Sequence, residues 1–398
     1  MSVTKLTNDN IENIMWSKLT GPLPALDGSA LTGITGGTTV MKAASDPAND
    51  TNPAGGVGTM YLNTTTGNMF ICIDATTGQN EWNNVGPGTG GVTYTPLPWA
   101  FGGLGGGTVS GWMMGSAQTT NVIQSYSYVS DGNAVDRADL SSTSNQGAGN
   151  SSATHGYKSG GHDGSQTTLI QKFAFVNPAA VASNVGNLAT GVSGGACSVG
   201  NTSHAYTVGG HGAVSVINDI QKFSYVSEGT AITAGAELTL PNYHNAGSAS
   251  LTYGYSAGGQ HGGPFNAVID RFAFASDGTM FHVGDLTTVT GYTTGESSDT
   301  HGYTTGGMLT APWANSTANI QKYAFASDAV TSTVAGSITI ARMKGSSSSS
   351  TTRGYHATGH DGSNFTNRLD RFDFANEAIT ADVGNMLAAV SGGGSAQS

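Results

Sequence analysis

The string IQKFAF at residues 170–175 decides the fold, because close variants of it occur six times along the chain, about fifty residues apart. The aromatic residues that end the Ile/Leu-x-x-aromatic run of each copy are Tyr126, Phe173, Phe223, Phe272, Tyr323 and Phe372. A second aromatic precedes each of them, at Trp112, Tyr157, Tyr206, Tyr255, Tyr303 and Tyr355. An apolar residue follows each of them by 14 or 15 residues, at Leu140, Leu188, Leu238, Leu286, Ile338 and Met386. Three markers in one register over six copies indicate a repeat protein.

The second repeat predicts four short strands and no helix. Residues 151–154 and 157–161 predict two strands joined by a tight turn at His155-Gly156, where glycine can adopt a positive φ. IQKFAF predicts the third strand, and residues 185–188 predict a shorter fourth strand after a turn at Asn177-Pro178. No segment of the repeats carries an apolar stripe with the period of a helix, so the repeats are expected to be all-β.

A thin four-stranded unit cannot bury its own faces, so the six units must pack against one another. Four strands in about fifty residues favour radial packing, as in a β-propeller. Glycine pairs at the end of the second strand fit this packing, because sheets crowd or the backbone turns away there. They are Gly160-Gly161, Gly209-Gly210, Gly258-Gly259 and Gly306-Gly307, with Gly115-Ser116 and Gly359-His360 in the first and sixth repeats.

The repeats resemble the kelch repeat over roughly Leu104 to Met386. The resemblance lies in the order of strands, in the aromatic strand that ends in Gly-Gly, and in the outer strand that leads to Ala341-Arg342. It is partial, because the tryptophan of the kelch fourth strand is absent from all six copies. The resemblance implies a six-bladed kelch-like β-propeller whose first strands line the central channel and whose fourth strands lie at the rim.

Composition excludes several classes of function. The chain has 398 residues, 60 glycines and a formal net charge of −11, with only 14 Lys plus Arg. No basic patch for phosphates is expected, and therefore no nucleic-acid binding. The sequence has neither a long apolar run nor a signal-peptide core, so we expect no membrane insertion. Cys72 and Cys197 lie in different segments and are expected to be buried thiols.

The first hundred residues have a different texture from the repeats. Residues 1–36 end in WSKLTGPLPALDGSALTGI, residues 37–56 have the composition of a linker, and residues 57–86 predict a small hairpin-based module around a Thr66-Gly67 turn, closed by Trp82. Both the KLTG-LPA-DGS-LTGI string and the small module are similar to segments of bacteriophage fibre proteins. The repeats, with HGYTTGG and IQKYAFASD, are similar to those of virion proteins of marine cyanobacterial phages.

This resemblance implies three parts and a place in the virion. Residues 1–36 would attach the protein to other virion proteins, residues 37–95 would form the linker and the fibre-type module, and residues 96–398 would form the propeller. It also implies a homotrimer that is assembled in the host cytoplasm. Whether the attachment point is the tail or the capsid stays open.

Repeated polar positions favour structural roles over chemistry. One repeat position is occupied by His155, His204 and His301. The favoured role is hydrogen bonding within turns, because histidines on separate blades could bind a shared metal ion only if their side chains converged near the channel. A second repeat position carries a lysine or arginine, and we expect its aliphatic side chain to pack between blades with the charged group at the edge. The residues at this position are Lys172, Lys222, Arg271, Lys322 and Arg371. The turn residues Asp131, Asp277 and Asp328 have a similar structural explanation. No catalytic motif, metal site or cofactor site is predicted.

The loops between second and third strands break the repeat, because they share a place but differ in content. An exposed aromatic among amides and hydroxyls can stack on a sugar ring and hydrogen-bond to it. The candidate ligand-binding residues are Trp313, Asn315, Asn319, Phe265, Phe365, His162, Asp163, His360 and Asp361. For the two His-Asp-Gly strings ordinary turn chemistry is the favoured alternative, and Trp313 can equally fold back into its loop.

The leading hypothesis is a non-enzymatic tail fibre or spike protein whose propeller loops bind a host-surface glycan. Three alternatives are kept: a propeller-borne polysaccharide depolymerase, which would need two carboxylates about 5 to 9 Å apart; a capsid-attached fibre without a host-binding role; and a cellular kelch-like scaffold.

Overall fold

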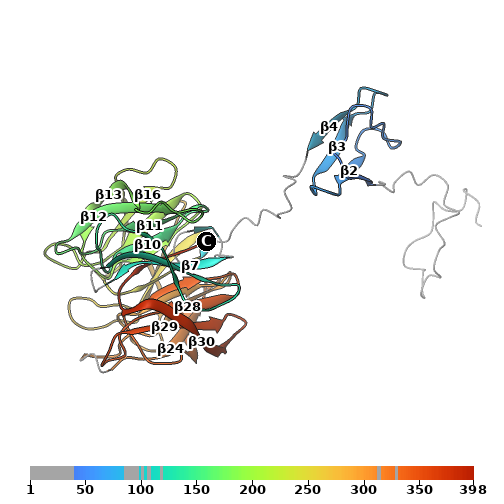
Figure 1. Cartoon of the computed structure of the whole chain (residues 1–398). Helices are drawn as coiled ribbons and strands as arrows, with labels where there is room; N and C mark the ends of the chain where they lie inside the picture. The colour runs from blue at the N-terminus through green and yellow to red at the C-terminus, as the bar shows by residue number, and fades with distance from the viewer. Residues whose placement is uncertain are drawn as a thin grey trace, which may run out of the picture. The chain divides into compact units, whose positions relative to one another are not determined.

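The computed structural model describes residues 40–84, 98–99, 103–104, 109–116, 120–311, 315–327 and 330–398. The chain divides into two compact units, Met1–Val92 and Thr93–Ser398 (Figure 1). The proposed attachment segment, residues 1–36, lies outside the described residues. Every element of the described part is a strand, as the repeats predict. That part contains no helix long and apolar enough to cross a membrane.

Residues 40–84 of the first unit form one four-stranded sheet in the order β1-β2-β3-β4. Its strands are β1 (Met41–Ala43), β2 (Met60–Asn63), β3 (Met69–Asp74) and β4 (Glu81–Asn84). The β2–β3 hairpin turns at Gly67, with φ 76°, and Tyr61 packs on Trp82 with 5.5 Å between ring centroids. Strand β1 pairs with β2 in parallel, so part of the stretch that composition assigns to a linker belongs to the module.

The described residues of the second unit form six sheets of four main strands, numbered here sheets 1 to 6. Sheet 1 is β31 (Gly394–Gln397), β7 (Ser110–Ser116), β8 (Thr120–Ser127) and β9 (Val135–Asp139). Sheet 2 is β10 (Ala148–Ser151), β11 (His155–Ser159), β12 (Thr167–Ala174) and β13 (Ser183–Val192). Sheet 3 is β14 (Cys197–Gly200), β15 (His204–Val208), β16 (Asp219–Ser224) and β17 (Ile232–Glu237).

The other three sheets repeat this pattern. Sheet 4 is β18 (Ala246–Ala249), β19 (Tyr253–Ala257), β20 (Val268–Ala273) and β21 (Phe281–Asp285), extended by β25 (Val330–Thr331). Sheet 5 is β22 (Thr294–Ser297), β23 (His301–Thr305), β24 (Asn319–Ala324) and β26 (Thr333–Ser337). Sheet 6 is β27 (Ser346–Ser349), β28 (Arg353–Ala357), β29 (Thr366–Asp373) and β30 (Asn376–Val390). A separate pair, β5 (Pro98–Trp99) and β6 (Gly103–Leu104), precedes them.

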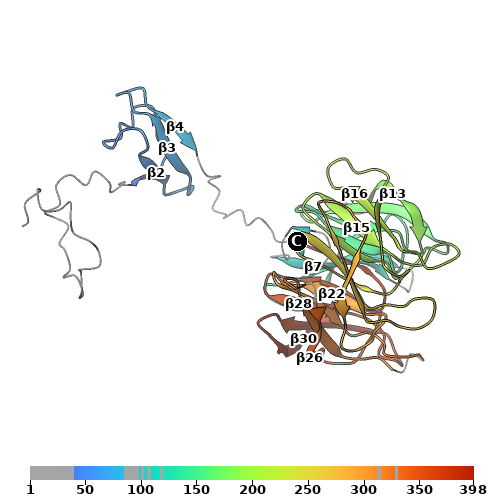
Figure 2. The same cartoon turned by 180° about the vertical axis from the view of Figure 1, so that it is seen from behind.

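The first strands of the sheets contact one another in a closed series, β31, β10, β14, β18, β22, β27 and back to β31. In Figure 1, β7 of sheet 1 lies between sheets 2 and 6, as this series requires, and Figure 2 shows the same unit from behind. The fold is therefore all-β and β-propeller-like, with the first strands on the inside. This confirms the predicted place of the first strands.

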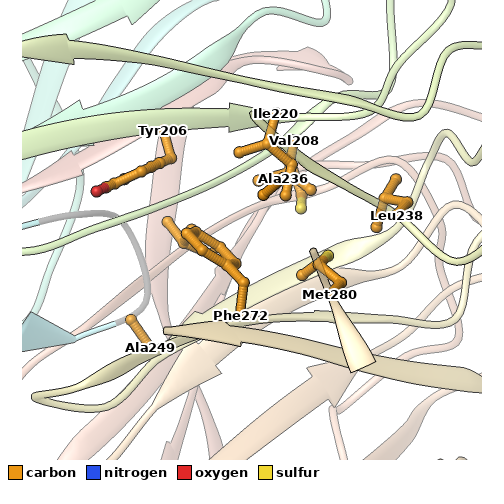
Figure 3. Close-up of a cluster of buried hydrophobic side chains, with 10 residues drawn as sticks. Tyr206, Val208, Ile220, Ala236, Leu238, Ala249, Phe272 and Met280 are labelled. Carbon is orange, nitrogen blue, oxygen red and sulfur yellow. The ribbon is translucent and has the colours of Figure 1, made fainter. Parts of the chain in front are cut away.

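An aromatic triad joins each sheet to the next. The aromatic of a second strand lies against two aromatics of the following sheet, one in its third strand and one just after it. Tyr206 does so against Phe272 and Phe274, at 5.1 and 5.3 Å between ring centroids. Figure 3 shows Tyr206 and Phe272 within the apolar cluster that fills this interface. The other five triads are Trp112 with Phe173 and Phe175, Tyr157 with Phe223 and Tyr225, Tyr255 with Tyr323 and Phe325, Tyr303 with Phe372 and Phe374, and Tyr355 with Tyr126 and Tyr128. All eighteen phased positions are buried.

The glycine before the second-strand aromatic serves this packing and not a turn. A Cβ on Gly156 would lie 2.3 Å from the Phe173 ring, so only glycine lets that ring cross the strand. The expected turn at His155-Gly156 is therefore wrong, because both residues belong to β11 and the chain turns at residues 152–154. The Gly-Gly pairs do have positive φ, and in sheet 6 the pair is Thr358-Gly359 instead of Gly359-His360.

A polar clamp accompanies each triad. Two residues before the third-strand aromatic, a buried Gln or Asp accepts a backbone N–H from the preceding sheet, at 2.7 to 3.0 Å. The donor and acceptor pairs are Ser141 to Gln171, Thr190 to Gln221, Thr239 to Asp270, Thr288 to Gln321, Thr339 to Asp370 and Leu387 to Gln124. These clamps give each interface a fixed register.

Strand β31 completes sheet 1 from the other end of the sequence. It pairs with β7, from Gly394 opposite Met114 to Gln397 opposite Gly111, and all four of its residues are buried. Gln397 also bonds both neighbouring sheets, through the backbone N–H of Ser349 and the hydroxyl of Ser151. Sequence reasoning missed this strand, although GGGSAQS at residues 392–398 resembles the start of each repeat.

We expect removal of residues 391–398 to abolish cooperative unfolding of the second unit, because β7 loses its partner and two sheets lose their link. Thermal melting followed by near-ultraviolet circular dichroism would check this, with removal of residues 1–8 as the control. A single melting transition at the parent temperature would show that β31 is dispensable.

Candidate functional site

The loops between second and third strands lie at the same end of the sheets as the segments that lead into the first strands. Bridges join the two within a sheet, as between Asn145 and His162, Tyr243 and Gln260, and Met343 and His360. The end of the ring where the inner strands begin is therefore where the predicted ligand loops converge. We call it the mouth face.

Six residues with left-handed backbone surround the inner strands at this face and form what we call the mouth ring. They are Gln146, Gly195, His244, Tyr292, Lys344 and Gly392, with φ between 52° and 69°. Neighbours are tied by backbone bonds, as from His244 N–H to Gly195 O at 2.6 Å and from Lys344 N–H to Tyr292 O at 2.9 Å. Glycine meets this conformation without strain, whereas a side chain costs about 1 kcal/mol or more. Four positions carry a side chain despite that cost.

Three of these side chains form a stack on sheets 4 to 6. The His244 ring lies on the Tyr292 ring at 4.0 Å, and Lys344 Nζ lies 4.7 Å from the centroid of the same tyrosine. The Tyr243 ring lies 4.8 Å from the His244 ring at a tilt of 47°, and Phe265 meets Tyr292 edge-on at 5.9 Å. We call these five residues the mouth stack.

Burial sets the electrostatics of the stack. It holds the pKa of His244 well below its usual value, so the imidazole is neutral at pH 7. Burial also lowers the pKa of Lys344 and raises the pKa of Tyr292 and Tyr243, which stay protonated at neutral pH. The stack therefore presents neutral rings with hydrogen-bonding edges beside the amine of Lys344.

Beside the stack the mouth ring encloses a hollow of about 100 Å³. Gly195, Gly392 and Gln146 line it together with the stack, and none of the described residues that line it is Asp or Glu. The inner strands close beneath it, since a Cβ on Gly295 would lie 2.1 Å from Gly247 O. Ser198 Oγ donates to Gly149 O at 2.6 Å and Ser347 Oγ to Gly295 O at 2.9 Å across the same strands. The hollow is thus a shallow seat beside an aromatic wall.

The structure brings only part of the predicted ligand set to this seat. Phe265 belongs to the mouth stack, whereas Phe365 is 40% exposed and lies against His360 at 4.9 Å. Asn315 is exposed and donates to Thr310 Oγ1 at 2.8 Å, and Asn319 begins strand β24 instead of standing in the loop. Trp313 lies outside the described residues.

The two His-Asp-Gly strings make ordinary turns. His162 Nδ1 and His360 Nδ1 accept the N–H of Gly164 and Gly362, at 3.2 and 3.0 Å. Asp163 accepts from Ser165, while Asp361 accepts from the N–H groups of Ser363 and Asn364, which lower its pKa. These bonds agree with the turn chemistry that the sequence favours.

The repeated histidines lie away from the mouth face. His155, His204 and His301 each begin a second strand, and each Nδ1 meets the hydroxyl of the preceding residue at 2.8 or 2.9 Å. They stand on three different sheets, and among the described residues no three His, Cys, Asp or Glu side chains gather as a metal site. They are hydrogen-bonded strand residues.

Sequence reasoning missed the mouth ring, although its signal was present. The six positions recur 48 to 52 residues apart, like the aromatic anchors. Their residue types differ so much that no motif marks them, and their shared property is a backbone conformation.

A layer of second-strand side chains supports the ring from below. Where the side chain is long, the inner-strand residue above it is glycine: a Cβ on Gly147 would lie 2.4 Å from Lys158 Nζ. Gly345 over His356 and Gly393 over Met113 repeat this arrangement. Where the side chain is short, the upper residue is larger, as in the pairs Ala196 and Thr207, Asn245 and Ser256, and Thr293 and Thr304. The combined side-chain volume of the two paired residues is therefore similar in all six sheets, whereas their charge differs.

Lys158 is the charged member of that layer. It is fully buried, its Nζ has no hydrogen-bond partner among the described residues, and burial lowers its pKa to about 7. Since the unfolded chain holds this proton up to about pH 10.5, stability should rise between pH 7 and pH 10.5.

We expect Lys158→Met to stabilise the protein by about 2–4 kcal/mol at pH 7, because Met113 fills the same place in sheet 1 without a charge to bury. The gain should shrink at pH 9, where the wild-type amine is already neutral in the fold. Urea unfolding of both proteins at the two pH values checks this. Equal stability of the two proteins at pH 7 would contradict it.

Comparison with known proteins gives a likeness of fold only. No family model matches the chain, and no curated protein matches it. Among solved structures, the one titled "Structure of YjhT" is similar with a TM-score of 0.53 and 11% sequence identity. The likeness covers 64% of this chain and 87% of that one. At this identity it supports the β-propeller-like architecture.

Proposed function

We propose that the protein is a non-enzymatic virion fibre or spike protein whose head is a six-bladed kelch-like β-propeller. Residues 1–36 attach it to the particle, the module formed by β1 to β4 helps to assemble a homotrimer, and the mouth face binds a glycan of the host surface. The protein is made in the host cytoplasm and acts in the virion. The fibre-like strings of the first hundred residues and the six phased repeats support the viral part of this proposal.

The mouth stack carries the binding part of the proposal. Sugar rings bind to proteins through an aromatic face and hydrogen bonds to hydroxyl groups. Tyr292 and Tyr243 offer aromatic surface and hydroxyl groups, and Lys344 and Gln146 offer donors beside the hollow. These groups lie at recurring positions just before the first strands, while the loops around them vary from sheet to sheet. A rigid seat with variable surroundings suits recognition of a surface polymer.

The same seat favours binding over hydrolysis. A glycosidase needs two carboxyl groups on either side of the bond that it cleaves. No Asp or Glu lines the hollow, and the loop carboxylates Asp163 and Asp361 are engaged by their own turns. Incubation with host polysaccharide therefore should leave its chain length unchanged, and shortened chains would indicate the depolymerase instead.

We expect Tyr292→Gly to weaken binding of host glycan by roughly three- to ten-fold, because it removes the centre of the stack. The melting temperature should hardly change, since glycine already occupies two positions of the mouth ring. Glycan-array or cell-adsorption measurements check the first result. Tyr253→Gly, at the start of β19, is the control. If both variants adsorb like the wild type, the mouth stack is not the binding surface, and Trp313→Ala then tests the loop.

We expect a protein that lacks residues 1–36 to fold normally but to stay out of virions, because its second unit is a closed ring of its own. Particles assembled with the truncated protein, purified and probed for it, would show the result. Incorporation at the wild-type level would move the attachment role to the module.

A further inference from the structure

Among the described residues, an ion pair lies beside the aromatic triad at four of the sheet interfaces, and the acid position of the interface between sheets 4 and 5, Asp328, lies outside them. The lysine or arginine before the third-strand aromatic meets an acid that lies five residues after the third-strand aromatic of the next sheet. The pairs are Lys172 with Glu228 at 2.5 Å, Lys322 with Glu377 at 2.6 Å, Lys222 with Asp277, and Arg371 with Asp131. In two cases the second-strand tyrosine also donates to the acid, Tyr206 to Asp277 at 2.9 Å and Tyr303 to Glu377 at 3.0 Å. The fold thus has a standard place for a carboxylate between sheets.

The interface between sheets 1 and 2 lacks both partners. Ser125 stands at the lysine position, and the turn that carries the acid in other sheets reads Asn177-Pro178 here. Asn177 lies four residues after Phe173, one fewer than Asp277 after Phe272 and Glu228 after Phe223, so this turn is one residue shorter. Asn177 nevertheless has a left-handed φ of 49°, close to the 48° of Asp277 and the 52° of Glu228. Trp112 replaces the tyrosine and turns its Nε1–H to Ser398 Oγ at 3.1 Å. The turn therefore keeps a left-handed residue beside the interface, but that residue has no carboxylate side chain.

A different strand nevertheless supplies a cationic side chain, Arg137, to this interface. Arg137 on β9 donates through Nε to Ser125 Oγ at 2.9 Å, which sets its guanidinium beside the missing lysine. The corresponding positions of the other repeats are Val185, Gly235, Val283, Ala335 and Val383, so this arginine is particular to sheet 1. Within the described residues Arg137 forms no ion pair.

A cavity of about 650 Å³ opens at this interface. Its lining includes the polar residues Arg137, Ser125, Asn177 and His155 and the apolar residues Phe175 and Val176. Ser398, the last residue of the chain, also lines it, and its carbonyl oxygen accepts the N–H groups of Val109 and Ser110. No Asp or Glu is among its lining residues, and burial beside Lys172 lowers the pKa of His155, which is neutral at pH 7. A groove of this size, with an aromatic wall and a few convergent donors, has the character of a small-molecule site.

We propose that this groove binds a small organic carboxylate of about the size of a sugar acid. Its carboxylate takes the place that Asp277 and Glu377 occupy at their interfaces, paired with the Arg137 guanidinium and in reach of the Asn177 amide. Its body lies against Phe175 and Val176, of which the valine is 79% exposed. The chain supplies its own carboxylate at four interfaces, and here the ligand supplies it.

Restoring the missing acid is the sharpest test. Asn177→Glu rebuilds the turn residue of sheet 3, Glu228, and should fold because glutamate already adopts this backbone there. Its carboxylate should occupy the Arg137 site and exclude the ligand. Ala179→Glu adds the same charge two residues away, outside the groove, and is the matched control. Arg137→Met removes the cation.

Calorimetry with glucuronate and glucose as probes gives the readout. We expect glucuronate to bind the wild type at least about ten-fold more tightly than glucose, as a charge-assisted pair requires. Asn177→Glu and Arg137→Met should each lose that preference, and Ala179→Glu should retain it. An oligomeric uronate tests whether the acid can be part of a polymer: inhibition of glucuronate binding by the oligomer shows that it can, and a lack of inhibition restricts the site to the free acid.

Two results would overturn the proposal. One is equal binding, or no binding, of glucuronate and glucose to the wild type. The other is unchanged glucuronate binding by Asn177→Glu, with circular dichroism showing that the variant is folded. Should Asn177→Glu not fold, Asn177→Asp takes its place, because Asp277 and Asp131 adopt the same backbone. The groove and the mouth face are tested by different variants, so either proposal can fail alone.

Discussion

The contact between the second-strand aromatic of one sheet and two aromatics of the next, one in its third strand and one just after it, is the constraint on which the ring depends. Aromatic pairs at such distances contribute about 0.5–1.5 kcal/mol each beyond the burial of their area. Each sheet uses both of its faces in this way, so it needs a neighbour on either side to bury its aromatic residues. The ring of sheets closes where Tyr355 of sheet 6 packs on Tyr126 of sheet 1. The strand glycines and the polar clamps serve this aromatic contact. The glycines let the rings approach the strands, and the clamps fix the register of one sheet against the next.

The packing of the side chains is alike at all six interfaces between sheets, whereas the charged residues differ from one interface to the next. Shape is conserved in all six, as the aromatic triads and the exchange of volume between Gly147 and Lys158 or Ala196 and Thr207 show. Charge varies: one interface keeps a fully buried pair, Arg342 with Asp370 at 2.8 Å, and another has a polar groove in place of an ion pair. A repeat fold can therefore vary its electrostatics without disturbing its packing, because the apolar contacts alone set the geometry.

Sequence reasoning could reach the features that are periodic in residue type. The eighteen anchors, the number of strands in each repeat, the absence of helix in the described part and the inner position of the first strands follow from spacing. It could not reach features that depend on long-range pairing or on backbone alone. The turn beside Gly156 was misplaced because the role of that glycine is set by Phe173. The mouth ring shares a conformation and not a motif, and Phe265 alone of the predicted ligand residues belongs to the mouth stack.

The pairing of β31 with β7 also has a consequence for the order in which the chain can fold. Sheets 2 to 6 form from neighbouring segments, and their contacts span few residues, whereas sheet 1 joins residues 394–397 to residues 111–114. During synthesis β7 must therefore wait, with one edge unpaired, until nearly three hundred further residues have left the ribosome. In that interval another copy can donate the same strand, since an open edge does not distinguish its own chain from a neighbour's. The closing strand that stabilises the finished ring thus makes the nascent chain open to strand exchange between copies.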